Sequence, residues 1–375
     1  MISTVIAKPT RECNASCTYC SAPPESGEHW SFYDFKRYFD RVRPALSDNC
    51  NWIWHGGEPT LLPPSFYVAC HDYARSHLPG IRFCIQTNLL NYSTKRWKNV
   101  FHTIFGGRVS TSFDPSSEER LLSGSSDLYN KTFKARLKQV VSDGLKPLVI
   151  TVIGKDDSSL VRDYAYAAIE ENIIDIRLNY MYPAGRAFNA DSIITPDDYG
   201  DLLIEVFDRW IDSGGRNEFV PVSQMLDAVT RRHVNRCPWT RDCASGFLSI
   251  TPIGDVYTCG TLTDLGDETL KYGNLNDIGN DPLELQFGIH RLLASEAATT
   301  VRARKYNLPK DCLSCEHFQE CQGGCQRDAA LYGRGLGGKY YYCGSWKKVF
   351  SHIKHRINSG HLNDVIARRR LGVSI

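Results

Sequence analysis

Three cysteines near the start of the chain have a spacing suited to an iron–sulfur cluster. Cys13, Cys17 and Cys20 follow an apolar run over residues 2–7 that is typical of a strand, so they fall in a loop at a strand end. Three thiolates can hold three irons of a four-iron cube, whereas a purely electron-carrying cluster usually has four cysteines. The spacing C-x3-C-x2-C therefore predicts a cluster with one iron free for another ligand. Three metal-free thiols, or a zinc site with a distant fourth ligand, are the alternatives.

The elements that must position this loop belong to an ordinary globular chain. Its 375 residues are 42% hydrophobic and 23% charged, enough for one large domain or two medium ones. A net charge of +2 predicts no nucleic-acid partner. No stretch approaches the roughly 20 apolar residues of a membrane-spanning helix, so we expect no membrane partner. We expect the run Arg368-Arg369-Arg370 to be a solvated tail.

The cysteine count indicates the compartment. Fourteen cysteines are present, and the first apolar run is too short for a signal peptide and is followed by Lys8 and Arg11. Many cysteines without secretion favour metal or cluster binding over disulfides. The sequence therefore predicts a cytoplasmic, reducing location. Cys50, Cys70 and Cys84 lie outside every motif, and we expect them in the core.

Strand-like and helix-like patterns alternate from residue 1 to about 213. The predicted strands are Ile2–Ala7, Asn51–His55, Ile81–Gln86, Arg108–Phe113, Pro147–Ile153 and Asp175–Met181. The predicted helices lie near 31–46, 65–77, 93–104, 129–143, 158–171 and 196–212, the last with Thr195 as cap and Pro196 in its first turn. Six units in series imply a parallel sheet with helices outside, and they are too few for an eight-unit barrel of about 250 residues. A partial (β/α)6 barrel fits better.

Polar motifs follow the second, third and fourth predicted strands, where the functional residues of such barrels lie. The motifs are His55-Gly56-Gly57-Glu58-Pro59, Gln86-Thr87-Asn88 and Ser112-Phe113-Asp114-Pro115. Glycines let the backbone approach a ligand closely, and a carboxylate beside them can receive an ammonium group. Taken singly, the first motif also fits a Gly-Gly turn closed by proline, and Asp114 also fits a turn cap.

Together with the three-cysteine loop, these motifs resemble the radical S-adenosylmethionine (SAM) superfamily. The resemblance implies a partial barrel in which Cys13, Cys17 and Cys20 hold a [4Fe-4S] cluster and the methionyl end of SAM binds the open iron. It also implies that Tyr19 lies beside the adenine. The other implied SAM contacts are Gly56, Gly57, Glu58 and Pro59 for the amino group, and Asn88, Ser112 and Asp114 for the ribose and carboxylate.

Eight more cysteines occur after residue 236, where periodicity fades. Cys237 opens a C-x5-C-x15-C pattern that continues to Cys243 and Cys259, and Cys312 opens C-x2-C-x5-C-x3-C, which continues through Cys315, Cys321 and Cys325, with Cys343 last. Eight cysteines can ligate two four-iron clusters completely. Zinc is the alternative for the C-x2-C pair.

With Gly254, this order of cysteines resembles the SPASM domain of radical SAM enzymes that modify peptides and proteins. The resemblance implies two auxiliary [4Fe-4S] clusters, one on Cys237, Cys243, Cys259 and Cys325 and the other on Cys312, Cys315, Cys321 and Cys343. It divides the chain into a barrel over 1–213, a connector over 214–236, a SPASM domain over 237–350 and a C-terminal helix or tail over 351–375.

The resemblance implies that reductive cleavage of SAM yields a 5′-deoxyadenosyl radical that abstracts hydrogen from a substrate. We expect an oxidoreductase that forms a carbon-centred cross-link in a ribosomally made precursor peptide, as cyclophane-forming (Xye-type) maturases do, with a flavodoxin- or ferredoxin-type reductant as partner. One alternative is an anaerobic sulfatase-maturating enzyme, which forms formylglycine. That family carries an aspartate base where this chain has Gly260, and loss of a base can cost about 10²–10⁴ in rate. A non-enzymatic iron–sulfur electron carrier is the other alternative.

Overall fold

The computed structural model describes residues 1–22, 27, 29–115, 118–187, 190–231, 237–360 and 362–371. None of the helices formed by these residues combines the length and the apolar character needed to span a bilayer.

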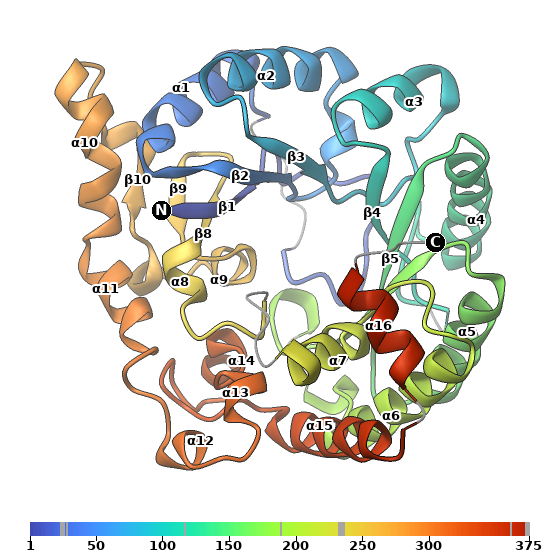
Figure 1. The fold of residues 1–375 in the computed structure, drawn as a ribbon. Coiled ribbons are helices and arrows are strands. Elements are labelled where there is room, and N and C mark those ends of the chain that lie inside the picture. The colour runs from blue at the N-terminus through green and yellow to red at the C-terminus, as the bar shows by residue number, and fades with distance from the viewer. Residues whose placement is uncertain are drawn as a thin grey trace.

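Six strands alternate with helices in the first half of the chain, as predicted. The strands are β1 (Ile2–Ala7), β2 (Leu46–Trp54), β3 (Arg82–Ile85), β4 (Arg108–Ser112), β5 (Lys146–Ile153) and β6 (Asp175–Tyr180). The helices are α1 (Phe32–Val42), α2 (Pro64–His77), α3 (Thr94–Thr103), α4 (Ser126–Ser142), α5 (Ser158–Glu171) and α6 (Pro196–Asp212). In Figure 1 these helices surround the strands from outside. The predicted α/β fold of strand–helix units is confirmed.

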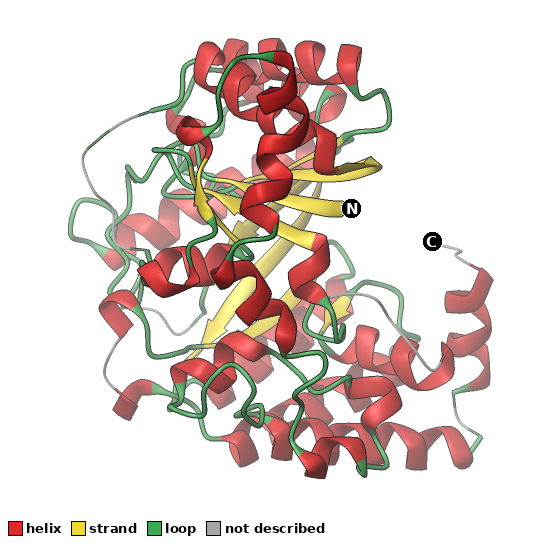
Figure 2. Ribbon diagram, turned by 90° about the vertical axis from the view of Figure 1, so that its left-hand side faces the viewer, coloured by secondary structure: helices red, strands yellow, loops and turns green. Residues whose placement is uncertain are grey.

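The strands form two parallel groups joined at one point. β1, β2 and β3 are parallel neighbours in one sheet, and β4, β5 and β6 are parallel neighbours in the other. A parallel bridge between Gln86 and Ser110 links the two groups. A further parallel strand, β7 (Phe219–Val220), pairs with β6 inside the predicted connector. Its two residues are too few to give a readable alternation. In Figure 2, β1 leads from the N-terminus toward the loops on the left, which follow the carboxyl ends of the strands.

Side-chain alternation and capping explain why these elements form. Along β5, buried side chains alternate with half-buried or exposed ones over the whole strand, which is typical of a strand packed under helices. Ser31 begins α1 with a reciprocal capping box to Asp34. Thr195 caps α6 and Pro196 fills its first turn, as predicted. Ser125 caps α4, so that helix begins three residues before its predicted start.

Aromatic rings fill the space between α1 and the first sheet. The ring centroid of Trp52 lies 5.4 Å from that of Phe35 on α1 and 5.9 Å from that of Trp54. Trp54 in turn stacks on Phe83 of β3 at 6.2 Å. Each such ring buries about 150–250 Å² and gains further from tilted or edge-to-face contact. This packing fixes the strands whose carboxyl ends carry the motifs.

The cysteine-rich part of the chain extends the first sheet. β8 (Phe247–Ile250) pairs in parallel with β1, and β9 (Asp255–Tyr257) and β10 (Gly273–Asn274) follow antiparallel, giving the order β10-β9-β8-β1-β2-β3. The remaining helices are α7 (Val222–Arg231), α8 (Cys243–Gly246), α9 (Gly260–Leu265), α10 (Pro282–Leu293), α11 (Glu296–Ala303), α12 (Lys310–Leu313), α13 (Phe318–Cys321), α14 (Gln326–Leu331), α15 (Cys343–Asn358) and α16 (Asn363–Leu371). The division of the chain into domains stays a prediction.

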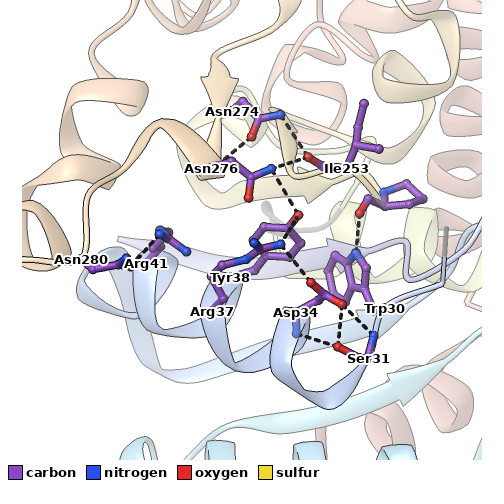
Figure 3. Close-up of polar contacts among 11 residues, drawn as sticks. Trp30, Ser31, Asp34, Arg37, Tyr38, Arg41, Ile253, Asn274, Asn276 and Asn280 are labelled. Atoms are coloured by element: carbon purple, nitrogen blue, oxygen red, sulfur yellow. Dashed lines mark hydrogen bonds and ion pairs between the residues drawn. The ribbon is translucent and has the colours of Figure 1, made fainter.

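Polar contacts join α1 to the segment around β9 and β10 (Figure 3). Trp30 donates its indole N–H to the carbonyl of Pro252 at 2.9 Å. Gly254, singled out from the cysteine pattern, has a φ of +89°, and a Cβ there would lie 3.0 Å from the ring of Tyr38. The glycine therefore serves both the turn between β8 and β9 and the close approach of α1.

The C-terminal helix is docked rather than solvated. Arg369 of α16 forms an ion pair with Asp227 at 2.9 Å and another with Glu218 at 3.1 Å. Its guanidinium also lies 5.4 Å from the ring of Trp210. The expected solvated tail is therefore wrong at Arg369, because this residue finds carboxylates that lie more than 140 positions away in the sequence.

Two of the three cysteines outside the motifs are core residues. Cys50 and Cys70 are fully buried, as expected. Cys84 is exposed, contrary to the expectation. It alternates along β3 with Phe83 and Ile85, whose side chains are buried, so it points to the opposite face of the sheet.

Candidate functional site

The loop that carries the first three cysteines is held by backbone contacts from two other strand-end loops. Ser16 donates its N–H to the carbonyl of Leu121, and Thr18 donates to that of Glu119, both at 2.9 Å. From the loop after β6, Arg186 donates its guanidinium to the carbonyl of Cys17 at 3.1 Å and its N–H to that of Cys20 at 3.0 Å. The loop is thus fixed on both sides. The sequence pattern gave no sign of Arg186.

The three thiols of this loop share one half-buried environment. Burial raises the pKa of Cys13 to about 12, and the charges of Cys17 and Cys20 add to this rise. Burial also raises the pKa of Cys17 and of Cys20. Grouped thiols that stay protonated alone are deprotonated when iron binds them. The donor set therefore fits the predicted three-cysteine cluster, although ligation itself stays a prediction.

The Gly-Gly motif packs against the chain that enters the cysteine loop. Gly57 donates its N–H to the carbonyl of Thr10 at 2.9 Å, and Glu58 donates to that of Glu12 at 2.7 Å. Gly56 has a φ of +117°, and a Cβ on Gly57 would lie 2.0 Å from the carbonyl oxygen of Glu12. The glycines were predicted to let the backbone approach a ligand. In the structure they let two backbone segments approach each other.

The Glu58 carboxylate is buried and accepts hydrogen bonds from its own protein. It accepts from the N–H and hydroxyl of Thr60 at 2.9 and 2.5 Å, from the hydroxyl of Thr87 at 2.6 Å and from the N–H of Asn88 at 2.7 Å. Burial raises the pKa of this carboxyl group despite these donors. The carboxylate thus ties the motif after β2, including Pro59, to the one after β3. Contact with SAM at these residues stays a prediction.

Asn88 and Ser112, two of the predicted SAM contacts, are half-exposed. The amide of Asn88 donates to the Asn14 side chain at 2.6 Å and lies 3.8 Å from the sulfur of Cys13. The hydroxyl of Ser112 accepts from Gln86 at 2.9 Å. The end of β3 therefore presents Asn88 beside the cysteine loop, while Ser112 at the end of β4 contacts Gln86; that either residue contacts SAM stays a prediction.

Asp114 lies in a buried ion pair with Arg120. The two side chains are 1% and 8% exposed, and the guanidinium lies 2.6 Å from the carboxylate. The same carboxylate accepts from the hydroxyl of Tyr19 and, at 2.8 Å, from the N–H of Val152. Burial works against the charge of Arg120, but the carboxylate raises the pKa of the guanidinium well above its usual range. The predicted SAM contacts of Tyr19 and Asp114 remain untested.

Arg120 links this ion pair to the cysteine loop, and no sequence pattern indicated it. Its neighbours Glu119 and Leu121 are the residues whose carbonyls hold Ser16 and Thr18. The only sequence signal was a cation six residues after Asp114, which is too common a pattern to predict a buried pair.

Four of the C-terminal cysteines are grouped although they are far apart in sequence. Burial raises the pKa of Cys243 to about 12, and the nearby charges of Cys237 and Cys259 add to it. Burial also raises the pKa of Cys325 strongly, again with contributions from Cys237 and Cys243. Cys259 directly precedes α9 and Cys325 directly precedes α14. These four are the set implied by the SPASM resemblance, here called the first auxiliary set.

The other four C-terminal cysteines, here called the second auxiliary set, line one cavity. The cavity wall includes Cys312, Cys315, Cys321 and Cys343, together with Tyr340 and other side chains. Burial raises the pKa of Cys321 to about 12, with additions from the other three thiols. Among the described residues, no three His, Cys, Asp or Glu side chains are grouped as they would be around a single metal ion. A cavity walled by four thiols suits the donor chemistry of a four-iron cluster.

A buried polar network joins the barrel to the cysteine-rich part, and no sequence pattern indicated it. Tyr180 at the end of β6 donates its hydroxyl to Asp328, and its oxygen lies 2.7 Å from the hydroxyl of Tyr340. Arg327 donates to Asp328 at 2.7 Å, and its guanidinium lies 4.2 Å from the ring of Tyr182. The network connects the carboxyl end of the sheet to α14, which directly follows Cys325.

A second buried contact lies beside Gly260. Lys8, which directly follows β1, forms an ion pair with Asp264 of α9 and donates to the carbonyl of Gly260 at 2.7 Å. The two charged side chains are 4% and 8% exposed. A Cβ on Gly260 would meet Ile6 at 3.4 Å. The position directly after Cys259 therefore contributes backbone alone, and the nearest acidic group along α9 is paired with Lys8.

Comparison with known proteins shows that the chain is similar to several maturating enzymes. It is 23% identical over 394 residues to the serine-type anaerobic sulfatase-maturating enzyme of Bacteroides thetaiotaomicron, covering 93% of this chain and 89% of that protein. It is 21% identical to the cysteine-type enzyme of Clostridium perfringens (strain ATCC 13124), covering 95% and 97%. It is 24% identical to the mycofactocin maturase MftC of Mycobacterium tuberculosis, covering 87% and 78%. No family model matches the chain.

Solved structures share the fold. The anSMEcpe structure with bound AdoMet superimposes with a TM-score of 0.79 at 19% identity, covering 96% of this chain and 99% of that one. Streptococcus suis SuiB bound to its precursor peptide SuiA gives a TM-score of 0.64 at 16% identity, covering 92% and 76%. The predicted fold therefore agrees with these solved structures, and the resemblance drawn from the motifs agrees with the sequence relatives.

Proposed function

We propose that this chain, a radical SAM enzyme of the SPASM type that acts on a peptide or protein, forms a carbon-centred cross-link of the cyclophane type in a ribosomally made precursor peptide. When bound, a [4Fe-4S] cluster and SAM would supply the 5′-deoxyadenosyl radical that abstracts hydrogen from the substrate. The chain itself binds and orients these groups and excludes water from them.

One observation carries the proposal: the motifs after β1, β2 and β3 form a single hydrogen-bonded unit. The backbone of Gly57 and Glu58 pairs with the chain entering the cysteine loop, and the Glu58 carboxylate holds the N–H of Asn88. Cys13, Cys17 and Cys20 would hold the cluster. Asn88, beside the cysteine loop, and Ser112, at the end of β4, are half-exposed polar groups that would orient SAM.

The two auxiliary sets would hold the other two [4Fe-4S] clusters. Eight thiols in two groups of four match the ligand number of two complete clusters. We also propose a cytoplasmic enzyme that receives its electron from a flavodoxin- or ferredoxin-type protein.

The local structure around Gly260 favours cross-linking over formylglycine formation. Formylglycine formation requires a proton acceptor for the thiol or alcohol that is oxidised. Gly260 offers no side chain, and Asp264 is paired with Lys8. The second candidate function, sulfatase maturation, is supported by the sequence similarity to serine-type and cysteine-type sulfatase-maturating enzymes.

Product analysis would separate the two candidates. The reconstituted, reduced protein would be incubated with SAM and either a precursor peptide encoded beside its gene or a sulfatase peptide carrying the modifiable Ser or Cys. Cross-linking would lower the mass of the precursor peptide by two hydrogens. In the tandem mass spectrum, the cross-linked segment would give no backbone fragments between the joined residues. An aldehyde on the sulfatase peptide, trapped by a hydrazide, would refute the cross-linking proposal. A variant with Cys13, Cys17 and Cys20 changed to alanine should cleave no SAM.

A further inference from the structure

One tight turn serves both auxiliary sets. Cys321 belongs to the second set and Cys325 to the first, and only three residues separate them. All three, Gln322, Gly323 and Gly324, have positive φ values of 55°, 88° and 67°. This turn, here called the 321–325 turn, therefore reverses sharply enough to send two nearby thiols to different sites.

The side chain of Arg304 holds this turn. Arg304 caps the carboxyl end of α11 and is 6% exposed. Its guanidinium donates to the carbonyl of Gly323 at 2.8 Å, in the middle of the turn. It also donates to the carbonyls of Leu336 and, at 3.0 Å, Gly338, which lie in the loop before Cys343. One cation thus fixes backbone near ligands of both sets.

The charge of Arg304 faces thiols rather than carboxylates. Among the described residues it forms no ion pair with Asp or Glu, since its donors go to backbone carbonyls. Burial lowers the pKa of the guanidinium, and the largest opposing effects come from the thiolates of Cys325, Cys243, Cys312 and Cys321. Two of these thiols belong to each auxiliary set, and Gly323, whose carbonyl the guanidinium holds, lies between Cys321 and Cys325 in the chain, so the cation lies near thiols of both sets.

We infer that Arg304 is a positioning residue shared by the two auxiliary sites, which fixes the 321–325 turn and raises the reduction potential of the cluster that each site holds. The inference rests on the proposed pair of auxiliary clusters. A four-cysteine cluster gains one negative charge on reduction, and a buried cation nearby stabilises that extra charge. One electron is gained, and no bond is formed or broken by Arg304.

The test compares R304Q and R304K with the wild type. R304Q removes the charge, and R304K keeps a point charge but loses the guanidinium fork. Iron content and electron paramagnetic resonance would be measured on anaerobically reconstituted protein poised at fixed potentials. In R304Q we expect the ratio of reduced to oxidised auxiliary clusters to fall at least tenfold at a given potential, about 59 mV for a one-electron couple. The signal of the three-cysteine cluster should not change, and R304K should lie closer to the wild type.

Arg41 provides a matched control. It is 4% exposed and donates to the carbonyl of Ile278 at 3.0 Å. It also donates to the amide oxygen of Asn280 at 2.9 Å (Figure 3). The charges that favour its ionised form come from phenols and Asp40 instead of cysteines. R41Q should therefore leave every cluster potential unchanged.

The outcomes separate this inference from the proposed function. If R304Q keeps the wild-type potentials and iron content, the inference is overturned while the two auxiliary clusters stand. Loss of auxiliary iron in R304Q but not in R41Q supports the positioning role. In that case the reduction potentials of the auxiliary clusters are measured in R304K. A wild type with no auxiliary iron would overturn the two-cluster proposal and, with it, this inference.

Discussion

Changing Asp114 to Asn should destabilise the barrel and release the iron of the three-cysteine site. The substitution keeps the shape of the side chain but leaves the guanidinium of Arg120 buried without its counter-ion. Removing one partner of a buried ion pair costs about 3–5 kcal/mol in unfolding free energy. Because Glu119 and Leu121 hold the cysteine loop through Ser16 and Thr18, the damage should reach the loop.

Urea unfolding of the metal-free protein measures the free energy of unfolding. Iron analysis of the reconstituted protein shows whether the cysteine loop still holds its cluster. The D114N variant should lose about four of about twelve irons, while the auxiliary clusters stay as an internal reference. Replacing both residues, as D114N/R120Q, removes the unpaired charge, so the double variant should be more stable than the sum of the single changes predicts. E205Q is the control, since its solvent-exposed pair with Arg162 should contribute little to the free energy of unfolding.

Two results would refute this reasoning. One is a loss below about 1 kcal/mol in D114N, the range of an exposed pair. The other is strict additivity in the double variant, which would mean that the two charges do not stabilise each other.

Two further predictions concern the motif after β2. Gly57→Ala should abolish the three-cysteine cluster, because its Cβ would lie 2.0 Å from the carbonyl oxygen of Glu12. Gly27→Ala is the control and should retain the cluster, because no atom lies within 4 Å of its Cβ position. Equal iron content in the two variants would contradict the packing argument. Burial, aided by a neighbouring lysine, lowers the pKa of His55 from 6.5 to about 4, and its ring nitrogen accepts from the N–H of Gly56 at 2.8 Å. As the pH falls, the unfolded state therefore binds the proton before the folded state does. The free energy of unfolding, measured by urea titration, should fall as the pH drops from about 6.5 to about 4. In H55Q this free energy should depend less steeply on pH.

The strand–helix order was predictable because each element carries its own periodicity. β5 alternates along its whole length, and α6 has its cap and first-turn proline in the sequence. β8 was not predicted, since its four residues become a strand only by pairing with β1, more than 240 positions earlier. Short strands of this kind are specified by their partners rather than by their own pattern.

The candidate ligand cysteines were predicted from their spacing, but the residues that hold their loops in place were not. Arg120 and Arg304 are buried cations whose partners are a single carboxylate and three backbone carbonyls, and neither has a periodic pattern. The grouping of Cys325 with Cys237 rather than Cys321 came from the family resemblance, because spacing alone cannot distinguish the pairings. Arg369 was misjudged for the same reason, since its carboxylates are distant in sequence.

The most direct test of the central claim is the metal content after anaerobic reconstitution. The wild type and a variant with Cys13, Cys17 and Cys20 changed to alanine would be analysed for iron and zinc. One catalytic and two auxiliary clusters predict about twelve irons falling to about eight in the variant. Zinc together with about four irons or fewer in the wild type would contradict the account, because the C-terminal cysteines would then hold a structural metal.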